Sequence, residues 1–83
     1  MKTLIEKKTT VKQQLSDVLL DISWARLSKR YFGKSSSWIY HKLDGIDGNG
    51  RAGEFTLSER IILKNALIDF SERLRNASEN IEI

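Results

Sequence analysis

Residues 23–44 read SWARLSKRYFGKSSSWIYHKLD, a sequence that predicts two short helices joined by a tight turn. Ser23 belongs to the residue types whose side chains cap a helix N-terminus. Gly33 suits the left-handed conformation in which helices often end, and one of the serines that follow it can cap the next helix. We therefore predict helices over residues 23–32 and 35–44, with a turn of about three or four residues between them.

A first helix is predicted before this pair. Thr3 and Glu6 have the spacing of a capping box, in which a hydroxyl and a carboxylate each satisfy a backbone N–H. An apolar stripe with helical spacing follows, so we predict a helix over residues 4–20 that packs on one side only. The stripe consists of Leu4, Val11, Leu15, Val18, Leu19 and Ile22.

A last helix is predicted after the pair, over residues 57–75, because Thr56 and Glu59 repeat the capping-box spacing. Residues 76–83 should fray. Between the pair and the last helix, residues 44–55 hold four of the five glycines. This density of turn residues forbids a helix and predicts a loop, with a small hairpin at most.

Together these elements predict an all-α fold, a single small four-helix domain over residues 1–83. Its helix-turn-helix-like segment is residues 23–44, and its glycine-rich loop, residues 44–55, precedes the last helix. A chain of 83 residues buries only about 60% of its unfolded surface, so two full domains are excluded. The predicted core consists of Leu15, Leu19, Leu27, Phe32, Ile39, Leu43, Phe55, Leu63, Leu67 and Phe70.

Composition excludes several classes of function. The chain has no cysteine, no proline and a single histidine, His41, so disulfides and thiolate sites are excluded and we expect no metal and no cofactor. Its apolar runs are far shorter than the roughly 18 residues of a membrane span, and its N-terminus is charged too early for a secretory signal. We therefore expect a cytoplasmic protein with no membrane association.

Catalytic and ligand-binding motifs do not fit either. The loop glycines match no phosphate-binding pattern, and a calcium loop starting at Asp47 fails because Arg51 and Ala52 occupy its fifth and sixth positions. A serine nucleophile needs a positioned base, and His41 has only Asp44 close by, where a surface pair is the more common arrangement. The sequence therefore predicts no catalytic residues and a binding protein instead of an enzyme.

Positive charge gathers in the helix pair. No acidic residue lies between Ile22 and Leu43, whereas residues 54–83 hold six acidic and four basic residues, and the whole chain carries a net charge of +3. A basic segment of this kind is compatible with binding to the phosphates of double-stranded DNA. The predicted phosphate contacts are Arg26, Lys29, Arg30, Lys34 and Lys42.

Helical spacing gives the predicted helix at 35–44 an inner and an outer face. Ile39 and Leu43 are expected to face inward, and Ser37 and His41 outward. Serine and neutral histidine can both exchange hydrogen bonds with base edges. The predicted base contacts are therefore Ser37, Tyr40 and His41.

Two other interpretations of this helix remain open. Trp38 and Tyr40 are equally compatible with ordinary core and rim positions of a small helical domain, in which His41 is merely solvated. They are also compatible with interface anchors of a protein-interaction module that binds no nucleic acid, since aromatic residues are enriched at such interfaces.

The run from Gly33 to Leu43 is similar to the turn and recognition helix of tetracycline-repressor-like regulators. In those proteins an aliphatic-tyrosine pair, here Ile39-Tyr40, comes just before a bulky apolar residue. In those regulators a glycine follows the small residue by four positions, whereas Gly33 follows Ser28 by five. The turn or helix end must therefore carry one extra residue, and such an insertion could rotate the next helix by about 100°.

A longer resemblance covers most of the chain. It consists of LSKRYFGKS at 27–35, SWIY at 37–40, GNGR at 48–51 and EFT at 54–56, with Glu59. These residues resemble a family of short uncharacterised proteins from gut Bacteroidetes, classed as a domain of unknown function. Arg51-Ala52 stands where that family usually has a lysine-proline pair. The resemblance implies an all-α, helix-turn-helix-like fold and a bacterial origin, and it implies no activity.

The predicted last helix has two apolar faces. The main arc consists of Ile62, Leu63, Ala66, Leu67, Phe70 and Leu74, and a second stripe on roughly the opposite side consists of Leu57, Ile61 and Ile68. A helix with two apolar faces needs two partners. We therefore predict either a homodimer through this helix or a sandwich in which the first and second helices cover both of its faces.

Overall fold

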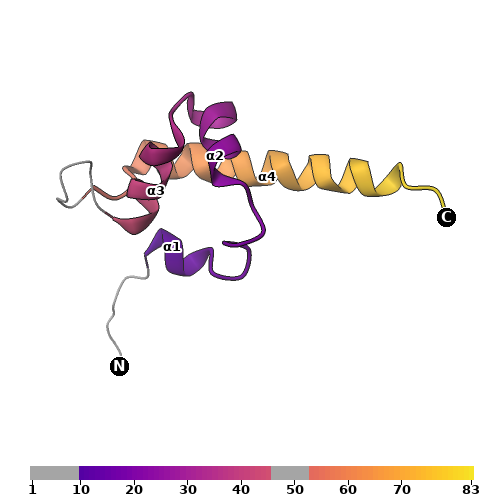
Figure 1. Cartoon of the computed structure of the whole chain (residues 1–83), viewed down its shortest axis with the longest axis horizontal. Coiled ribbons are helices and arrows are strands. Elements are labelled where there is room, and N and C mark those ends of the chain that lie inside the picture. Colours follow the sequence, from indigo (N-terminus) through magenta and orange to yellow (C-terminus); the bar gives the residue numbers. More distant parts are fainter. Residues whose placement is uncertain (1–9, 46–52) are drawn as a thin grey trace.

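The computed structural model describes residues 10–45 and 53–83, and every regular element within these ranges is helical (Figure 1). The elements are α1 (Val11–Gln14), α2 (Trp24–Leu27), the π-helical turn η1 (Ser28–Phe32), α3 (Ser36–Asp44) and α4 (Leu57–Glu79). In Figure 1, α2 and α3 lie against the first half of α4, whose second half projects away alone. The predicted all-α fold is confirmed.

The central helix pair begins and ends as predicted. The Ser23 hydroxyl accepts a hydrogen bond from the backbone N–H of Arg26 at 3.4 Å, and α2 starts at the next residue. α3 is capped by Ser35, whose hydroxyl accepts from the Trp38 N–H at 3.3 Å. Gly33 adopts the left-handed conformation with φ 66°. Local capping therefore fixes both sides of the turn.

The end of the first helix in this pair holds one extra residue. Residues 28–32 form a π-helical turn, in which the Gly33 N–H donates to the Ser28 carbonyl five residues earlier. Since a π-helical turn contains more residues than an α-helical turn, η1 takes up the longer spacing between serine and glycine. Ser28 is fully buried, and its hydroxyl donates to the carbonyls of Lys34 at 3.2 Å and Ser35 at 2.8 Å. This side chain ties η1 to the start of α3.

The predicted first helix over residues 4–20 is confirmed at residues 11–14 and is wrong from residue 15 on. Within the described part of this range only α1 is α-helical, and its N-terminus is a capping box formed by Thr10 and Gln13. Residues 15–21 form successive turns instead. The predicted capping box at Thr3 lies outside the described residues.

Tight backbone turns replace the helix after Gln14. The bonds there span three residues instead of four, as in the bond from the Val18 N–H to the Leu15 carbonyl at 2.9 Å. The turns pack on the core, since Leu15 and Leu19 lie against the buried cluster and the Trp24 indole N–H donates to the Leu19 carbonyl at 2.7 Å. Tertiary packing therefore overrides the helical apolar pattern here.

The last helix begins as predicted and ends later. Thr56 and Glu59 form the predicted capping box, in which each side chain accepts a bond from the other residue's backbone N–H. α4 then continues to Glu79, four residues beyond the predicted end at residue 75. No glycine or proline occurs between its two ends, so nothing in the sequence stops it earlier.

The loop before α4 is closed at its base. The Gly53 N–H donates to the Gly45 carbonyl at 2.9 Å, and Gly45 ends α3 in the left-handed conformation with φ 77°. The predicted hairpin falls in residues 46–52, which are outside the described ranges. This bond holds the end of α3 beside the segment that leads into α4.

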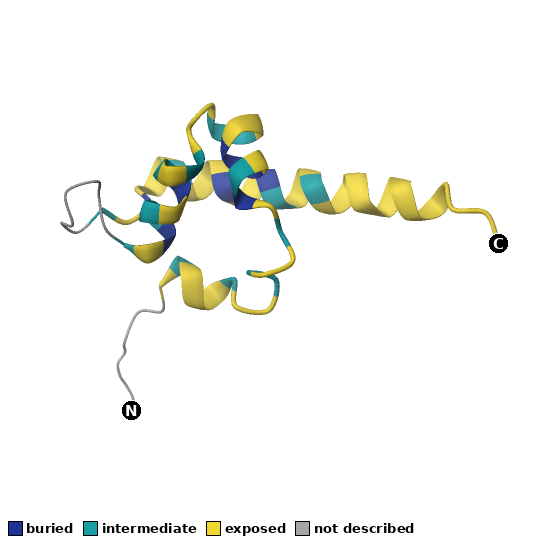
Figure 2. Ribbon diagram, viewed as in Figure 1, coloured by how far each residue is buried: buried dark blue, intermediate teal, exposed yellow. Residues whose placement is uncertain are grey.

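The core lies where α2, α3 and the first half of α4 meet (Figure 2). Its buried hydrophobic members are Trp24, Leu27, Ile39, Leu43, Phe55, Leu63 and Ala66. The predicted core residues Leu15, Leu19, Phe32 and Leu67 are half-buried against this cluster. Phe70 is also half-buried. Trp24 and Ala66 are the buried hydrophobic residues that the predicted core did not include.

The second apolar stripe of α4 is exposed, since Leu57, Ile61 and Ile68 are 74%, 54% and 49% accessible. The predicted sandwich therefore does not form among the described residues. We expect the chain to self-associate through this stripe, which sedimentation equilibrium at about 100 μM protein tests. Ile61→Lys combined with Ile68→Lys should give a monomer, whereas Asn76→Lys should not. A wild-type chain that sediments as a monomer would contradict this expectation.

Candidate functional site

α3 presents two of the predicted base-contacting residues on its outer side. Ile39 and Leu43 are buried on the inner side, whereas Ser37 is exposed and His41 is half-buried. Their helical positions place Ser37 and His41 opposite the buried pair. Within residues 10–45 and 53–83, neither of these two side chains has a hydrogen bond or an ion pair. Both are therefore available to an external ligand.

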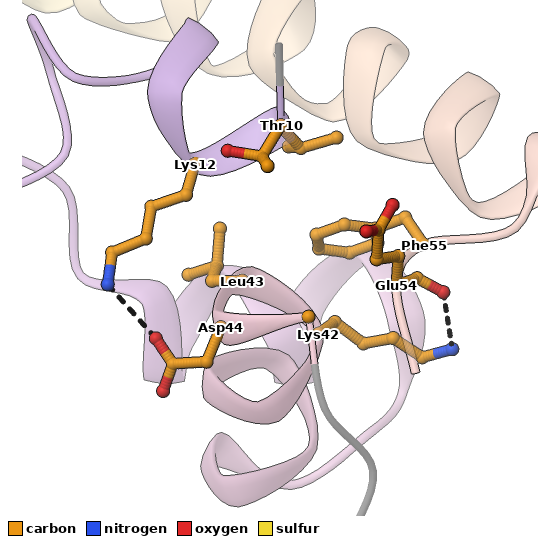
Figure 3. A pocket seen from close by; sticks show the side chains of 9 residues that line it. Thr10, Lys12, Lys42, Leu43, Asp44, Glu54 and Phe55 are labelled. Carbon is orange, nitrogen blue, oxygen red and sulfur yellow. Dashed lines mark hydrogen bonds and ion pairs between the residues drawn. The ribbon is translucent and has the colours of Figure 1, made fainter. Parts of the chain in front are cut away.

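Tyr40, the third predicted base contact, lies on another side of α3. It lines a cavity of about 280 Å³ together with Leu19 and Lys12 from the N-terminal segment. The Lys12 ammonium and the Asp44 carboxylate, which pair at 3.0 Å, line this cavity. They also line a neighbouring cavity beside Leu43 and Phe55, which Figure 3 shows. Asp44 thus pairs with Lys12 and not with His41. Ser37 and His41 therefore share the outer face of α3, and Tyr40 lies beside Ser37 on the flank that borders the N-terminal segment.

Lys42 is used inside the protein. Its ammonium lies 3.0 Å from a carboxylate oxygen of Glu59. The same ammonium donates to the Glu54 carbonyl at 3.3 Å, as Figure 3 shows. It also lies 5.7 Å from the centre of the Trp38 ring, in the position of a cation–π contact. Lys42 therefore connects α3 to the start of α4, and this predicted phosphate contact is already paired within the protein.

The carboxylate that holds Lys42 is itself fixed by the start of α4. Partial burial raises the pKa of the Glu59 carboxyl, but the hydrogen bonds from Thr56 and the neighbouring Lys42 ammonium outweigh it, so the pKa lies below its ordinary value. Glu59 is therefore ionised at neutral pH. The capping box and the ion pair share one carboxylate, which couples the orientation of α3 to that of α4.

Trp38 belongs to an aromatic cluster beside this ion pair. Its ring centre lies 4.9 Å from that of Phe32 and 6.2 Å from that of Phe55, and the Phe32 and Phe55 centres are 6.3 Å apart. These separations are typical of stabilising aromatic pairs. Trp38 thus occupies an ordinary core or rim position of a small helical domain. Its contacts join α3 to η1 and to the segment before α4.

The remaining predicted phosphate contacts, Arg26, Lys29, Arg30 and Lys34, are all exposed. None of the four has an ion-pair partner among the residues that the structure describes. Lys34 lies in the turn directly before the cap of α3. These side chains therefore form a basic surface over α2, η1 and the turn that leads to α3.

The structure divides this basic surface. Arg26 and Arg30 line a cavity of about 350 Å³ whose other wall includes Phe70 and Arg73 of α4, and no residue of α3 lines it. Sequence reasoning did not identify Arg73. Its hydrogen bond to Tyr31 joins residues 42 positions apart, and no local pattern indicates a contact over such a separation.

Two other features, a metal-binding cluster and a membrane-spanning helix, are absent from the described part of the chain. It contains no group of three or more histidine, cysteine, aspartate or glutamate residues placed to hold a metal ion. None of the helices described above has the length and apolar character needed to cross a membrane.

Comparison with known proteins gives a family and no activity. Neither a curated protein nor a solved structure matches the chain. The family model described as "Domain of unknown function (DUF5053)" matches residues 11–81, a span that runs from the start of α1 to just past the end of α4. The chain therefore belongs to this family, the domain of unknown function DUF5053.

Proposed function

We propose that this protein binds double-stranded DNA, with α3 in the major groove and with α2 and η1 along the sugar-phosphate backbone. The proposal rests on one observation. On the outer face of α3, the side chains of Ser37 and His41 have no partner among the described residues. A basic surface without ion pairs immediately precedes this face. A binding role of this kind requires no catalytic residue, and DNA is reached in the cytoplasm that we expect for this protein.

The two groups of residues have different roles in this proposal. Ser37 and His41 contact base edges, because both side chains can donate and accept hydrogen bonds. Tyr40 contacts bases only at the edge of the interface, since it lies on another side of α3. Exposed cations such as Lys29 and Lys34 contact phosphates, which set the position of the protein but do not read the sequence.

The π-helical turn η1 helps to hold α3 in the orientation that DNA binding requires. A helix can read bases only if it is held at a fixed angle to the helix that contacts the backbone. The buried Ser28 hydroxyl bonds two carbonyls of the turn, and the aromatic cluster with Trp38 packs α3 against η1. Both contacts hold α3 in one orientation while its outer face stays open.

Salt dependence provides the first test. Duplex binding, measured by fluorescence anisotropy, should weaken steeply with salt because each neutralised phosphate releases a counterion and adds about 0.9 to the log–log slope. Lys34→Ala should weaken binding to all sequences and lower that slope by about 1. Lys64→Ala removes the same charge from an exposed position on α4 and should have a smaller effect.

Base contacts predict a second, sequence-dependent effect. Ser37→Ala or His41→Ala should cost about 1 to 3 kcal/mol of binding free energy, mainly at a preferred site. The preferred site is obtained by selection from random duplexes. If the selection enriches no motif, and the protein also fails to bind duplexes at about 150 mM salt, the proposal is wrong.

A helical protein-interaction module is the second candidate function, and the exposed stripe of α4 favours it. The partner would contact Leu57, Ile61 and Ile68, which are all largely accessible. Trp38 is packed with Phe32 and Phe55, so it is not free to act as the anchor that the sequence suggested. The two functions use different surfaces, so changes to the outer face of α3 and to the exposed stripe of α4 separate them.

A further inference from the structure

The cavity between α2 and α4 carries an excess of positive charge. Its volume is about 350 Å³, and its lining includes Arg26, Arg30 and Arg73 but a single carboxylate, Asp21. Among the described residues, none of the three arginines has an ion pair. Three guanidinium groups around one cavity, with one carboxylate against them that is unpaired within the described ranges, are a suitable environment for an anion.

Arg73 is held in position by contacts with both walls of the cavity, Tyr31 of η1 and Phe70 of α4. Its Nη1 donates to the Tyr31 hydroxyl oxygen at 3.2 Å, and the Tyr31 hydroxyl in turn donates to the Asp69 carboxylate. The guanidinium carbon lies 5.7 Å from the centre of the Phe70 ring, within the range of a cation–π contact. A side chain fixed in this way loses less conformational entropy when it binds a ligand.

Arg26 and Arg30 approach from the opposite wall. They are four residues apart, on the side of α2 and η1 that faces α4, and both line the cavity. Arginine presents a planar fork of N–H donors that matches the oxygens of a phosphate group. Two guanidinium groups from one wall and the fixed Arg73 guanidinium group from the other can therefore surround a single phosphate.

We propose that Arg26, Arg30 and Arg73 form a phosphate-binding site between α2 and α4. We further infer, on the basis of the proposed function, that the phosphate belongs to the DNA backbone. The site would bind the backbone at a distance from the bases that α3 contacts. Free inorganic phosphate has the same chemistry, and the experiments below distinguish the two sources.

The site itself is tested with inorganic phosphate and the whole 83-residue chain. Titration at constant ionic strength, followed by NMR of the arginine side-chain Nε–Hε signals, should give saturable shifts at Arg26, Arg30 and Arg73 and none at Arg75. Arg73→Gln should abolish the saturable shifts of the other two. Shifts that are equal at all arginines, or that do not saturate, would overturn the site.

The link to DNA is tested with a matched pair of variants. Arg73→Gln and Arg75→Gln remove the same charge from exposed positions two residues apart on α4, so a general electrostatic effect would weaken duplex binding equally. We expect Arg73→Gln to weaken binding about tenfold, and Arg75→Gln less than about twofold. Arg73→Lys keeps the charge but loses the fork, and it should lie between the two. Melting temperatures show whether each variant is folded.

The outcomes separate the two proposals. Saturable phosphate shifts with no duplex binding by the wild-type chain would support the site and overturn DNA binding. Duplex binding with equal losses for Arg73→Gln and Arg75→Gln would overturn the DNA-backbone assignment, whatever the phosphate titration shows. Saturable shifts together with a selective loss for Arg73→Gln would support both.

Discussion

Ile39→Ala is expected to lower the free energy of unfolding by about 2 to 5 kcal/mol. Ile39 is 0% exposed and belongs to the cluster that joins α2, α3 and α4, so its truncation leaves a cavity that the surrounding side chains cannot easily fill. Small domains have only about 5 to 15 kcal/mol of stability in total. The variant should therefore be close to unfolding, which urea denaturation followed by circular dichroism measures.

Residues on the outer face of α3 provide the control. Ser37→Ala and His41→Ala remove groups without a partner among the described residues, and they should change the free energy of unfolding by less than about 0.5 kcal/mol. A loss below about 1 kcal/mol for Ile39→Ala would mean that Ile39 lies outside the core. Equal losses on the two faces would contradict the orientation of α3.

The helix pair could be predicted because its determinants are local. Ser23 and Ser35 bond backbone groups three residues away, and Gly33 ends the helix through its own conformation. The longer spacing between Ser28 and Gly33 also indicated the extra residue that η1 contains. Capping and glycine spacing act within a few residues, so their consequences are visible in the sequence.

The end of the first helix could not be predicted because it depends on tertiary packing. Leu15, Val18 and Leu19 have helical spacing, yet residues 15–21 form turns from which Leu15 and Leu19 pack against the core. Periodicity shows which residues are apolar and how they are spaced, but it does not show how the chain packs around them. A short helix is also marginal on its own, so packing can replace it with turns.

The division of the basic surface could not be predicted either, because it depends on contacts between residues that are far apart in the sequence. Arg26 and Arg30 were predicted as phosphate contacts from charge alone, whereas their neighbour Arg73 lies on a helix whose segment of the chain is acidic overall. Lys42 was assigned to the same set, but Glu59 and Glu54 bind its ammonium. Charge patterns identify candidate cations, and only the packing of α2 and α3 against α4 decides which of them remain unpaired.

Trp38→Ala is expected to lower the free energy of unfolding by about 3 kcal/mol. The indole packs against Phe32 and Phe55, and its ring lies beside the Lys42 ammonium, so truncation removes two aromatic contacts and a cation–π contact together. Trp38→Phe keeps part of the cluster and should lose less. Both are measured by chemical denaturation.

Comparison with Tyr40→Ala shows whether Trp38 has a role in the core or at an interface. Tyr40 is exposed and has no hydrogen bond among the described residues, so its truncation should cost less than about 1 kcal/mol. If Trp38 were instead an interface anchor, Trp38→Ala would leave the stability of the isolated chain nearly unchanged, as Tyr40→Ala does. A large loss for Trp38→Ala alone would place Trp38 among the residues that hold α3 in position, and it would leave α4 as the surface available to a protein partner.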